Sequence, residues 1–140
     1  MIGLDTNVLV RYLAQDDDTQ APLANRCIET QCSEEHPGFI NHIVLCELTW
    51  VLKVSYKTPK SSIVQAIRQL LATKQLSVQE SPLIWEALKI YEGANVDFAD
   101  AVIVATNRRH GCNKTVTFDR GAGKLSDVVK LDTSKNEAHD

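Results

Sequence analysis

Short apolar runs alternate with helical patterns along this chain of 140 residues, and this alternation constrains the fold more than any other feature. Alternating strands and helices predict a parallel sheet with helices on both faces. No internal repeat or linker interrupts the order, so we expect one α/β domain. The expected strands are 1–5, 37–41, 75–79, 114–119 and 127–131, and the expected helices are 6–14, 19–31, 42–54, one beginning at 58, one from 81 to 93 and one beginning at 97.

Several helix starts carry capping residues. Thr58 precedes Pro59, which combines a good N-cap residue with a proline at the first helical position. Asp97 is also a natural N-cap, and Asp100 then falls at the third helical position, where an acid favours the helix dipole. A structural role therefore accounts for Asp97 without any ligand.

The composition is that of a soluble globular protein, with 44% apolar and 24% charged residues. The net charge of −3 shows no overall nucleic-acid-binding character, although basic residues gather at 53–60 and 107–114. No apolar run is long enough to cross a bilayer, and Asp5 interrupts the apolar start too early for a signal peptide. We therefore expect a cytoplasmic protein that makes no contact with a membrane.

The four cysteines do not follow a disulfide or zinc pattern. Cys27, Cys32, Cys46 and Cys112 form no CxxC pair, and the histidines do not add paired ligand spacings. We expect buried or free thiols of a reducing compartment.

Acidic residues occupy places where a charge is costly. Asp5 and Asp119 end predicted strands, and ligands of α/β folds bind beyond the carboxyl ends of strands. Glu47 has only apolar neighbours three and four residues away on its helix, so we expect it to project from a buried face. Asp100 directly precedes an apolar run. Each acid alone also has a structural explanation, because Asp commonly closes strands and caps helices.

Taken together, these acids predict a cation site. Asp5, Glu47, Asp100 and Asp119 come from four elements that a parallel sheet would bring to one edge, and four carboxylates cannot all stay ionised there without a cation. Among basic residues, only Arg11 or Arg120 is placed to contribute. An all-oxygen acidic site suits Mg²⁺ or Mn²⁺, which activate water and hold phosphates.

The same residues lie in blocks that resemble a known family. "GLDTNVLVRYL", "ELTWVL", "DFADAVIVATNRRHG" and "VTFDR" are similar to the motifs of PIN-domain ribonucleases, and most of all to the small VapC-type toxins of toxin–antitoxin pairs. The motifs occur in the order of the family, and the resemblance runs from residue 1 to residue 131.

The resemblance assigns a role to each acid. Asp5 corresponds to the metal ligand of the first strand, Glu47 to the acid of the apolar helix, Asp100 to the third acid and Asp119 to the acid of the last motif. Two further positions, Asn7 and Thr117, match polar residues that support the site through hydrogen bonds. Asp97 matches a more variable upstream position, and its role stays open.

The resemblance also implies a fold, an activity and partners. It implies a three-layer α/β/α sandwich around a central parallel sheet, with one nuclease domain over residues 1–131 and a disordered tail over 132–140. It implies hydrolysis of RNA phosphodiester bonds with Mg²⁺ or Mn²⁺, a homodimer, and inhibition by a small antitoxin whose C-terminal segment enters the active-site groove.

Two other functions stay open. An Asp-dependent phosphatase of the haloacid-dehalogenase type would use Asp5 as nucleophile, but such enzymes carry D-x-D-x-T and this chain has Asn7 in place of the second Asp. A non-catalytic PIN-like domain that binds RNA or a protein would not need the complete acid set.

Overall fold

The computed structural model describes residues 1–119 and 125–131 and divides the chain into two compact units. These are Met1–Ser81 and Pro82–Asp140, which we call unit 1 and unit 2. The expectation of one domain over residues 1–131 stays a prediction. The predicted disordered tail, residues 132–140, lies outside the described residues.

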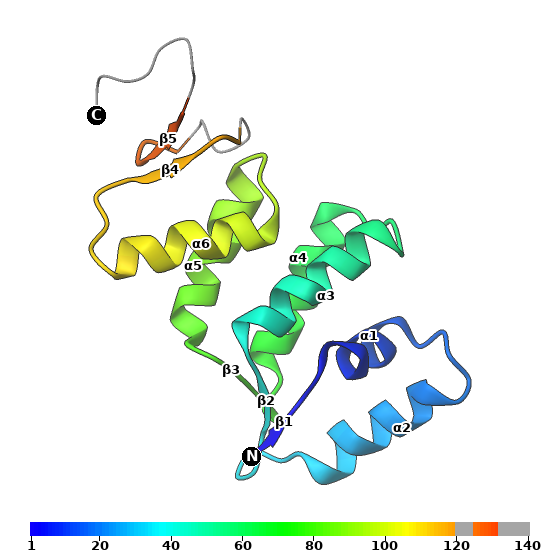
Figure 1. Cartoon of the computed structure of the whole chain (residues 1–140). Coiled ribbons are helices and arrows are strands. Elements are labelled where there is room, and N and C mark those ends of the chain that lie inside the picture. The colour runs from blue at the N-terminus through cyan, green and yellow to red at the C-terminus, as the bar shows by residue number, and fades with distance from the viewer. Residues whose placement is uncertain (120–124, 132–140) are drawn as a thin grey trace. The chain divides into compact units, whose positions relative to one another are not determined.

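Unit 1 is built on a three-stranded parallel sheet (Figure 1). The strands β1 (Ile2–Gly3), β2 (Gly38–Ile40) and β3 (Leu76–Val78) follow the order β1-β2-β3. Gly38 pairs with both Ile2 and Leu76, and the next residue, Phe39, pairs with both Gly3 and Ser77, so β2 is the central strand. The parallel strand pairing confirms the predicted α/β class.

Close packing explains the glycine at the start of β2. A Cβ atom at Gly38 would lie 2.7 Å from Leu4 Cδ1 and 3.0 Å from Cys32 Sγ, which is shorter than ordinary van der Waals contact. Any larger residue at this position would therefore have to displace the Leu4 and Cys32 side chains.

The first and third helices of unit 1 have the predicted bounds. Helix α1 spans Thr6–Ala14 and helix α3 spans His42–Val54. Asn41 caps α3, because its Oδ1 accepts a hydrogen bond of 2.9 Å from the backbone N–H of Val44. The apolar stripe of α3 packs into the core through Val44, Leu45, Leu48, Thr49 and Leu52.

Two helices of unit 1 differ from the prediction. Helix α4 spans Lys60–Ala72, and Pro59 rather than Thr58 holds the N-cap position, because its backbone is extended (φ −64°, ψ 152°) and helical geometry begins only at the next residue. The helix predicted over 19–31 is two segments, namely α2 (Gln20–Arg26) and a π-helical turn η1 (Cys27–Gln31). Spacing of apolar residues does not distinguish such a turn from α-helix.

Unit 2 contains two helices and a two-stranded parallel sheet (Figure 1). Helix α5 (Ser81–Gly93) begins where unit 1 ends, and helix α6 spans Phe98–Arg109. Strands β4 (Thr115–Thr117) and β5 (Val128–Lys130) pair in parallel.

Each unit has its own buried residues. Tyr91 and Phe98 join α5 to α6 by an edge-to-face contact, with ring centroids 5.6 Å apart. Arg108 joins α6 to the start of β5 through two hydrogen bonds of 2.7 Å to the Asp127 carboxylate. The largest fully buried side chains of unit 1 are Leu9, Ile28, Ile40, Leu45, Leu48, Ile63, Ile67 and Leu70.

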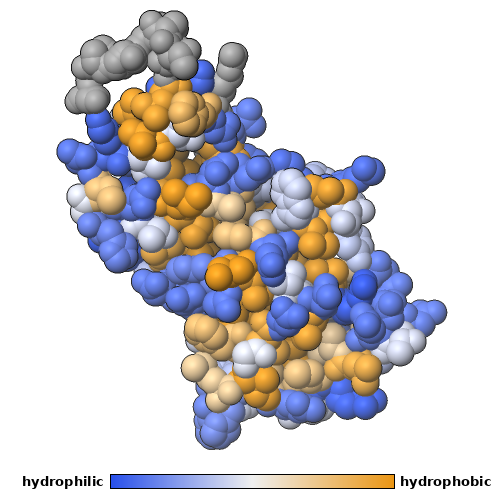
Figure 2. Space-filling view, viewed as in Figure 1, coloured by the Kyte–Doolittle hydropathy of each residue, from blue (hydrophilic) through white to orange (hydrophobic). Residues whose placement is uncertain are grey.

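Apolar side chains also reach the surface, where they form orange patches among polar residues in Figure 2. In unit 1 the exposed large apolar residues include Leu23, Ile43 and Trp50. Within residues 1–119 and 125–131, no helix combines the length and apolar character needed to cross a membrane.

Candidate active site

Asp5 lies beyond the carboxyl end of β1 and forms the N-cap of α1. Its backbone is extended, and its Oδ1 accepts a hydrogen bond of 2.8 Å from the backbone N–H of Thr6. The structural role that the sequence suggests for this aspartate is therefore present. The residue is nevertheless exposed, which leaves its carboxylate accessible to a cation.

Glu47 is linked to the same place by Thr6. The buried hydroxyl of Thr6 donates a hydrogen bond of 2.5 Å to Glu47 Oε1. A short contact of this kind is typical of a hydroxyl that donates to a charged carboxylate. Thr6 thus contacts Asp5 through its backbone and Glu47 through its side chain, and holds the two acids at one point of unit 1.

The predicted burial around Glu47 is wrong in unit 1. Glu47 is exposed, and so are Ile43 and Trp50, with 72% and 58% of their surface accessible. The error arose because α3 is apolar on more than one side, so the neighbours of Glu47 do not reveal which face is buried.

The second pair of acids belongs to unit 2. Asp100 is in the first turn of α6, and Asp119 follows β4 by two residues. Both line a cavity of about 130 Å³ together with Thr117. Burial raises the pKa of the Asp100 carboxyl above its ordinary value, and the adjacent Asp119 carboxylate raises this pKa further.

Thr117 and Asp97 lie close to the two acids of unit 2 in the sequence, and each has a defined place in the local backbone structure. The backbone N–H of Asp119 donates a hydrogen bond of 3.0 Å to Thr117 Oγ1, so Thr117 fixes the chain at the acid that it was predicted to support. Asp97 holds the N-cap position of α6, but its side chain makes no capping hydrogen bond. Its backbone N–H instead donates to the Asp100 carboxylate. The predicted side-chain cap at Asp97 is therefore wrong, and Asp100 supplies the reciprocal half of a capping box.

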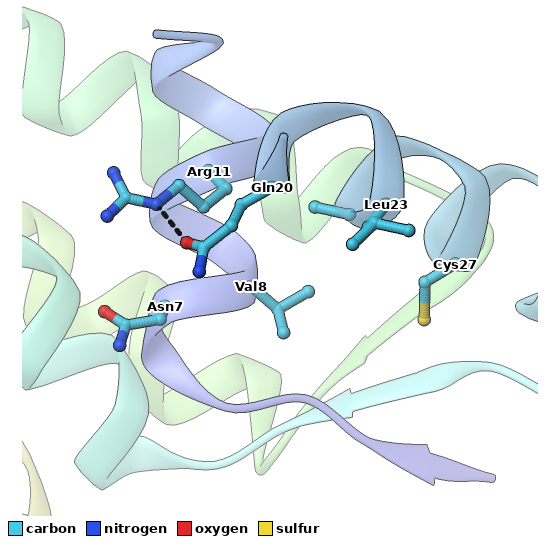
Figure 3. A pocket seen from close by; sticks show the side chains of 7 residues that line it. Asn7, Val8, Arg11, Gln20, Leu23 and Cys27 are labelled. Atoms are coloured by element: carbon cyan, nitrogen blue, oxygen red, sulfur yellow. Dashed lines mark hydrogen bonds between the residues drawn. The ribbon is translucent and has the colours of Figure 1, made fainter. Parts of the chain in front are cut away.

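Asn7 and Arg11 lie on α1 beside a mainly apolar cavity of about 250 Å³ in unit 1 (Figure 3). Arg11 Nε donates to Gln20 Oε1 at 2.8 Å, and its guanidinium forms an ion pair of 3.7 Å with Asp16. Arg11 is thus engaged along α1 and α2 rather than with the predicted site acids. Arg120, the other basic residue considered, lies outside the described residues.

The donor chemistry fits a hard divalent cation. Unit 1 presents Asp5 and Glu47, and unit 2 presents Asp100 and Asp119. Mg²⁺ is commonly held by one or two carboxylates, with water and substrate phosphates as its other ligands. Within the part of the chain that the structure describes, no three His, Cys, Asp or Glu side chains are grouped to hold a metal ion. Each pair alone supplies the donor number that Mg²⁺ uses.

Sequence reasoning missed Thr6, the residue that joins two of the acids. Its position could have indicated this role, because Thr6 directly follows a strand-ending aspartate and lies in the first turn of a helix whose buried face includes Leu9 and Val10.

Residues 2–128 match the PIN domain family, and the chain belongs to that family. This confirms the resemblance stated from the sequence and the α/β sandwich that goes with it. The chain is also similar to a protein of Aquifex aeolicus named "VapC ribonuclease", with 25% identity over 122 residues that cover 87% of this chain and 90% of the relative. A solved structure titled "Toxin-antitoxin complex from Klebsiella pneumoniae" is 18% identical, with a TM-score of 0.35, and covers 93% of this chain and 97% of that chain.

Proposed function

We propose that this PIN-domain protein is a metal-dependent endoribonuclease and the toxin of a toxin–antitoxin pair. The observation that carries the proposal is the Asp100–Asp119 pair, two neighbouring carboxyls in one cavity with the pKa of Asp100 raised. Such a pair is stabilised by a proton or by a cation between its members. The relative named "VapC ribonuclease" supports RNA as the substrate.

Asp5, Glu47, Asp100 and Asp119 are the proposed catalytic and metal-binding residues, with Mg²⁺ or Mn²⁺ as the ion. When bound, the ion would lower the pKa of a coordinated water and offset the charge of the phosphate. Thr6 holds the Glu47 carboxylate through its hydroxyl, and Thr117 holds the backbone at Asp119. Asn7, exposed in the first turn of α1, is proposed to support the site through hydrogen bonds.

The test is cleavage of a fluorescent single-stranded RNA by the full chain with Mg²⁺ or Mn²⁺. The variants Asp100→Asn and Asp119→Asn should lower the rate by about 100-fold or more, since loss of a partner that only orients a ligand already costs about 10–100-fold. Asp18→Asn, a change at an exposed acid that is not among the proposed site residues, is the matched control and should leave the rate unchanged.

Metal binding provides a second measurement. Isothermal titration with Mn²⁺ should give heat for the wild type and little for Asp100→Asn. Full activity in both aspartate variants would refute the assignment. Mn²⁺ binding without RNA cleavage would instead favour a binding domain, and hydrolysis of a phosphomonoester would favour the phosphatase.

The partners are proposed from the sequence resemblance. A small antitoxin should be encoded next to this chain, and the chain should form a homodimer. Co-expression with the product of an adjoining small reading frame, followed by affinity purification and light scattering, tests both. We expect a homodimeric chain in a stable complex that does not cleave RNA. A monomeric chain that does not bind the co-expressed product would contradict both proposals.

A further inference from the structure

Two cysteines of unit 1 lie at the two ends of the π-helical turn. Cys27 begins η1 and Cys32 directly follows it, and the Cys27 thiol is one of the groups that raise the pKa of the Cys32 thiol. Both are free thiols in this structure. The pair does not form a CxxC motif, because Cys32 comes five positions after Cys27.

The π-helical turn brings the backbones of these two residues close together. In an α-helix, five residues rise about 7.5 Å along the axis. Disulfide-bonded residues have Cα atoms about 4.4–6.8 Å apart, so regular α-helix would hold this pair too far apart. A π-helix closes its hydrogen bonds from residue i to residue i+5, and it therefore stacks Cys32 over Cys27.

The two thiols differ in access. Cys27 is half-buried and lines the cavity beside α1 together with Val8 and Leu23 (Figure 3). Cys32 is 4% exposed and packs against Gly38. Burial raises the pKa of the Cys32 thiol, with a further contribution from Cys27, so Cys32 is protonated at neutral pH. The Cys27 sulfur is thus accessible to a small reagent, whereas the Cys32 sulfur is buried.

We propose that Cys27 and Cys32 form a redox-modification site, a dithiol that hydroperoxides convert to a reversible intramolecular disulfide. The Cys27 thiolate attacks one oxygen of hydrogen peroxide, so that an S–O bond forms, the O–O bond breaks and the departing hydroxide is protonated to water. The Cys32 sulfur then attacks the Cys27 sulfur, the S–S bond forms, and the second oxygen leaves as water with the Cys32 proton. The two thiols lose two electrons together, and the peroxide gains them.

Oxidation changes the surface beside the candidate active site. Formation of the bond turns the Cys27 sulfur from the cavity towards Cys32 and fixes the end of η1 in place. The cavity that Cys27 shares with Asn7 and Arg11 then loses one of its walls. Disulfides of reducing compartments are usually transient and redox-sensing, which suits a bond that a thiol reductant reverses.

Peptide mapping of the full chain tests the proposal. Reduced protein is treated with hydrogen peroxide, remaining thiols are alkylated, and the protein is cut after glutamates. Cleavage at Glu29 separates Cys27 from Cys32, and cleavage at Glu35 separates both from Cys46. The expected product is a disulfide-linked pair of peptides containing Cys27 and Cys32, with an intact mass lower by two hydrogens that a dithiol reductant restores.

Matched variants show whether the pair itself reacts. Cys112→Ser removes an exposed thiol elsewhere and should still form the bond, whereas Cys27→Ser, with an unchanged circular dichroism spectrum, should not. Cys27 that is oxidised to sulfinic acid without any linked peptide would overturn the proposal. Linkage found only through Cys112 or Cys46 would overturn it equally.

Discussion

The hydrogen bond from Thr6 to Glu47 should be measurable as a coupling energy in unfolding experiments. Replacing Thr6 by Val keeps the shape of the side chain but removes the hydroxyl that donates to Glu47 Oε1 at 2.5 Å. A hydrogen bond to a charged group contributes about 1.5–3 kcal/mol. Glu47 is exposed, so water replaces the hydroxyl in the variant and reduces the expected loss to about 1 kcal/mol.

A double-mutant cycle isolates this contact from other effects of the substitution. Thr6→Val and Glu47→Ala should each destabilise the protein, and the double variant should lose about 1 kcal/mol less than the sum. Thr49 is the matched control, because it is also a buried threonine of unit 1, but its hydroxyl donates to the carbonyl of Cys46 at 2.9 Å. The cycle of Thr49→Val with Glu47→Ala should give a coupling within about 0.5 kcal/mol of zero.

Fluorescence-detected urea unfolding provides the assay. Trp50 lies on α3 one turn after Glu47, and a Trp85→Phe background removes the only other tryptophan. Thr6→Ser retains the hydroxyl and should restore the coupling. Equal coupling energies for Thr6 and Thr49 would refute the bridging role, and RNA cleavage that is unaffected by Thr6→Val would show that the contact serves folding alone.

Three further changes have defined outcomes. Burial and a neighbouring carboxylate raise the pKa of Asp100 in the folded protein, so ionisation of this carboxyl costs stability as pH rises above its unfolded pKa of 3.8. Asp100→Asn should therefore raise Tm at pH 7 in the presence of a chelator. This gain in Tm should shrink as the solution is acidified. Gly38→Ala places a methyl group against Leu4 and should cost about 1–3 kcal/mol in urea unfolding. Arg108 lowers the pKa of Asp127, so the ion pair between them stabilises the fold at neutral pH, and this stabilisation is lost as pH falls through the lowered pKa. Asp127→Asn should cost about 1 kcal/mol at pH 7, a value discounted for partial exposure. A pH series of melting curves should show no cost of this substitution at strongly acidic pH.

Regular elements of this fold could be predicted from the sequence because local signals agreed with tertiary packing. Helices α1 and α3 both have the predicted bounds. The position of Asp5 after β1 followed from the same agreement. At Thr58 the predicted boundary was wrong by one residue, although Thr58 and Pro59 together supported it.

Features that depend on atomic packing were not predictable. The spacing of apolar residues in the second helix did not reveal η1, because this spacing does not distinguish a single π-helical turn from α-helix. The burial of Glu47 was wrong because α3 has apolar residues on its exposed side. Asp97 has the backbone of an N-cap, but whether its side chain caps the helix is decided by its rotamer.

The π-helical turn also has a consequence for how this sequence varies among relatives. A turn that closes from residue i to residue i+5 accommodates one residue more than an α-helical turn, so loss of one residue between Cys27 and Cys32 would restore α-helix. The two sulfurs would then no longer be stacked in this way. In an alignment, such a loss would appear as a gap of a single position. Relatives with that gap should be free to vary both cysteines independently, whereas relatives without it should keep or lose them together.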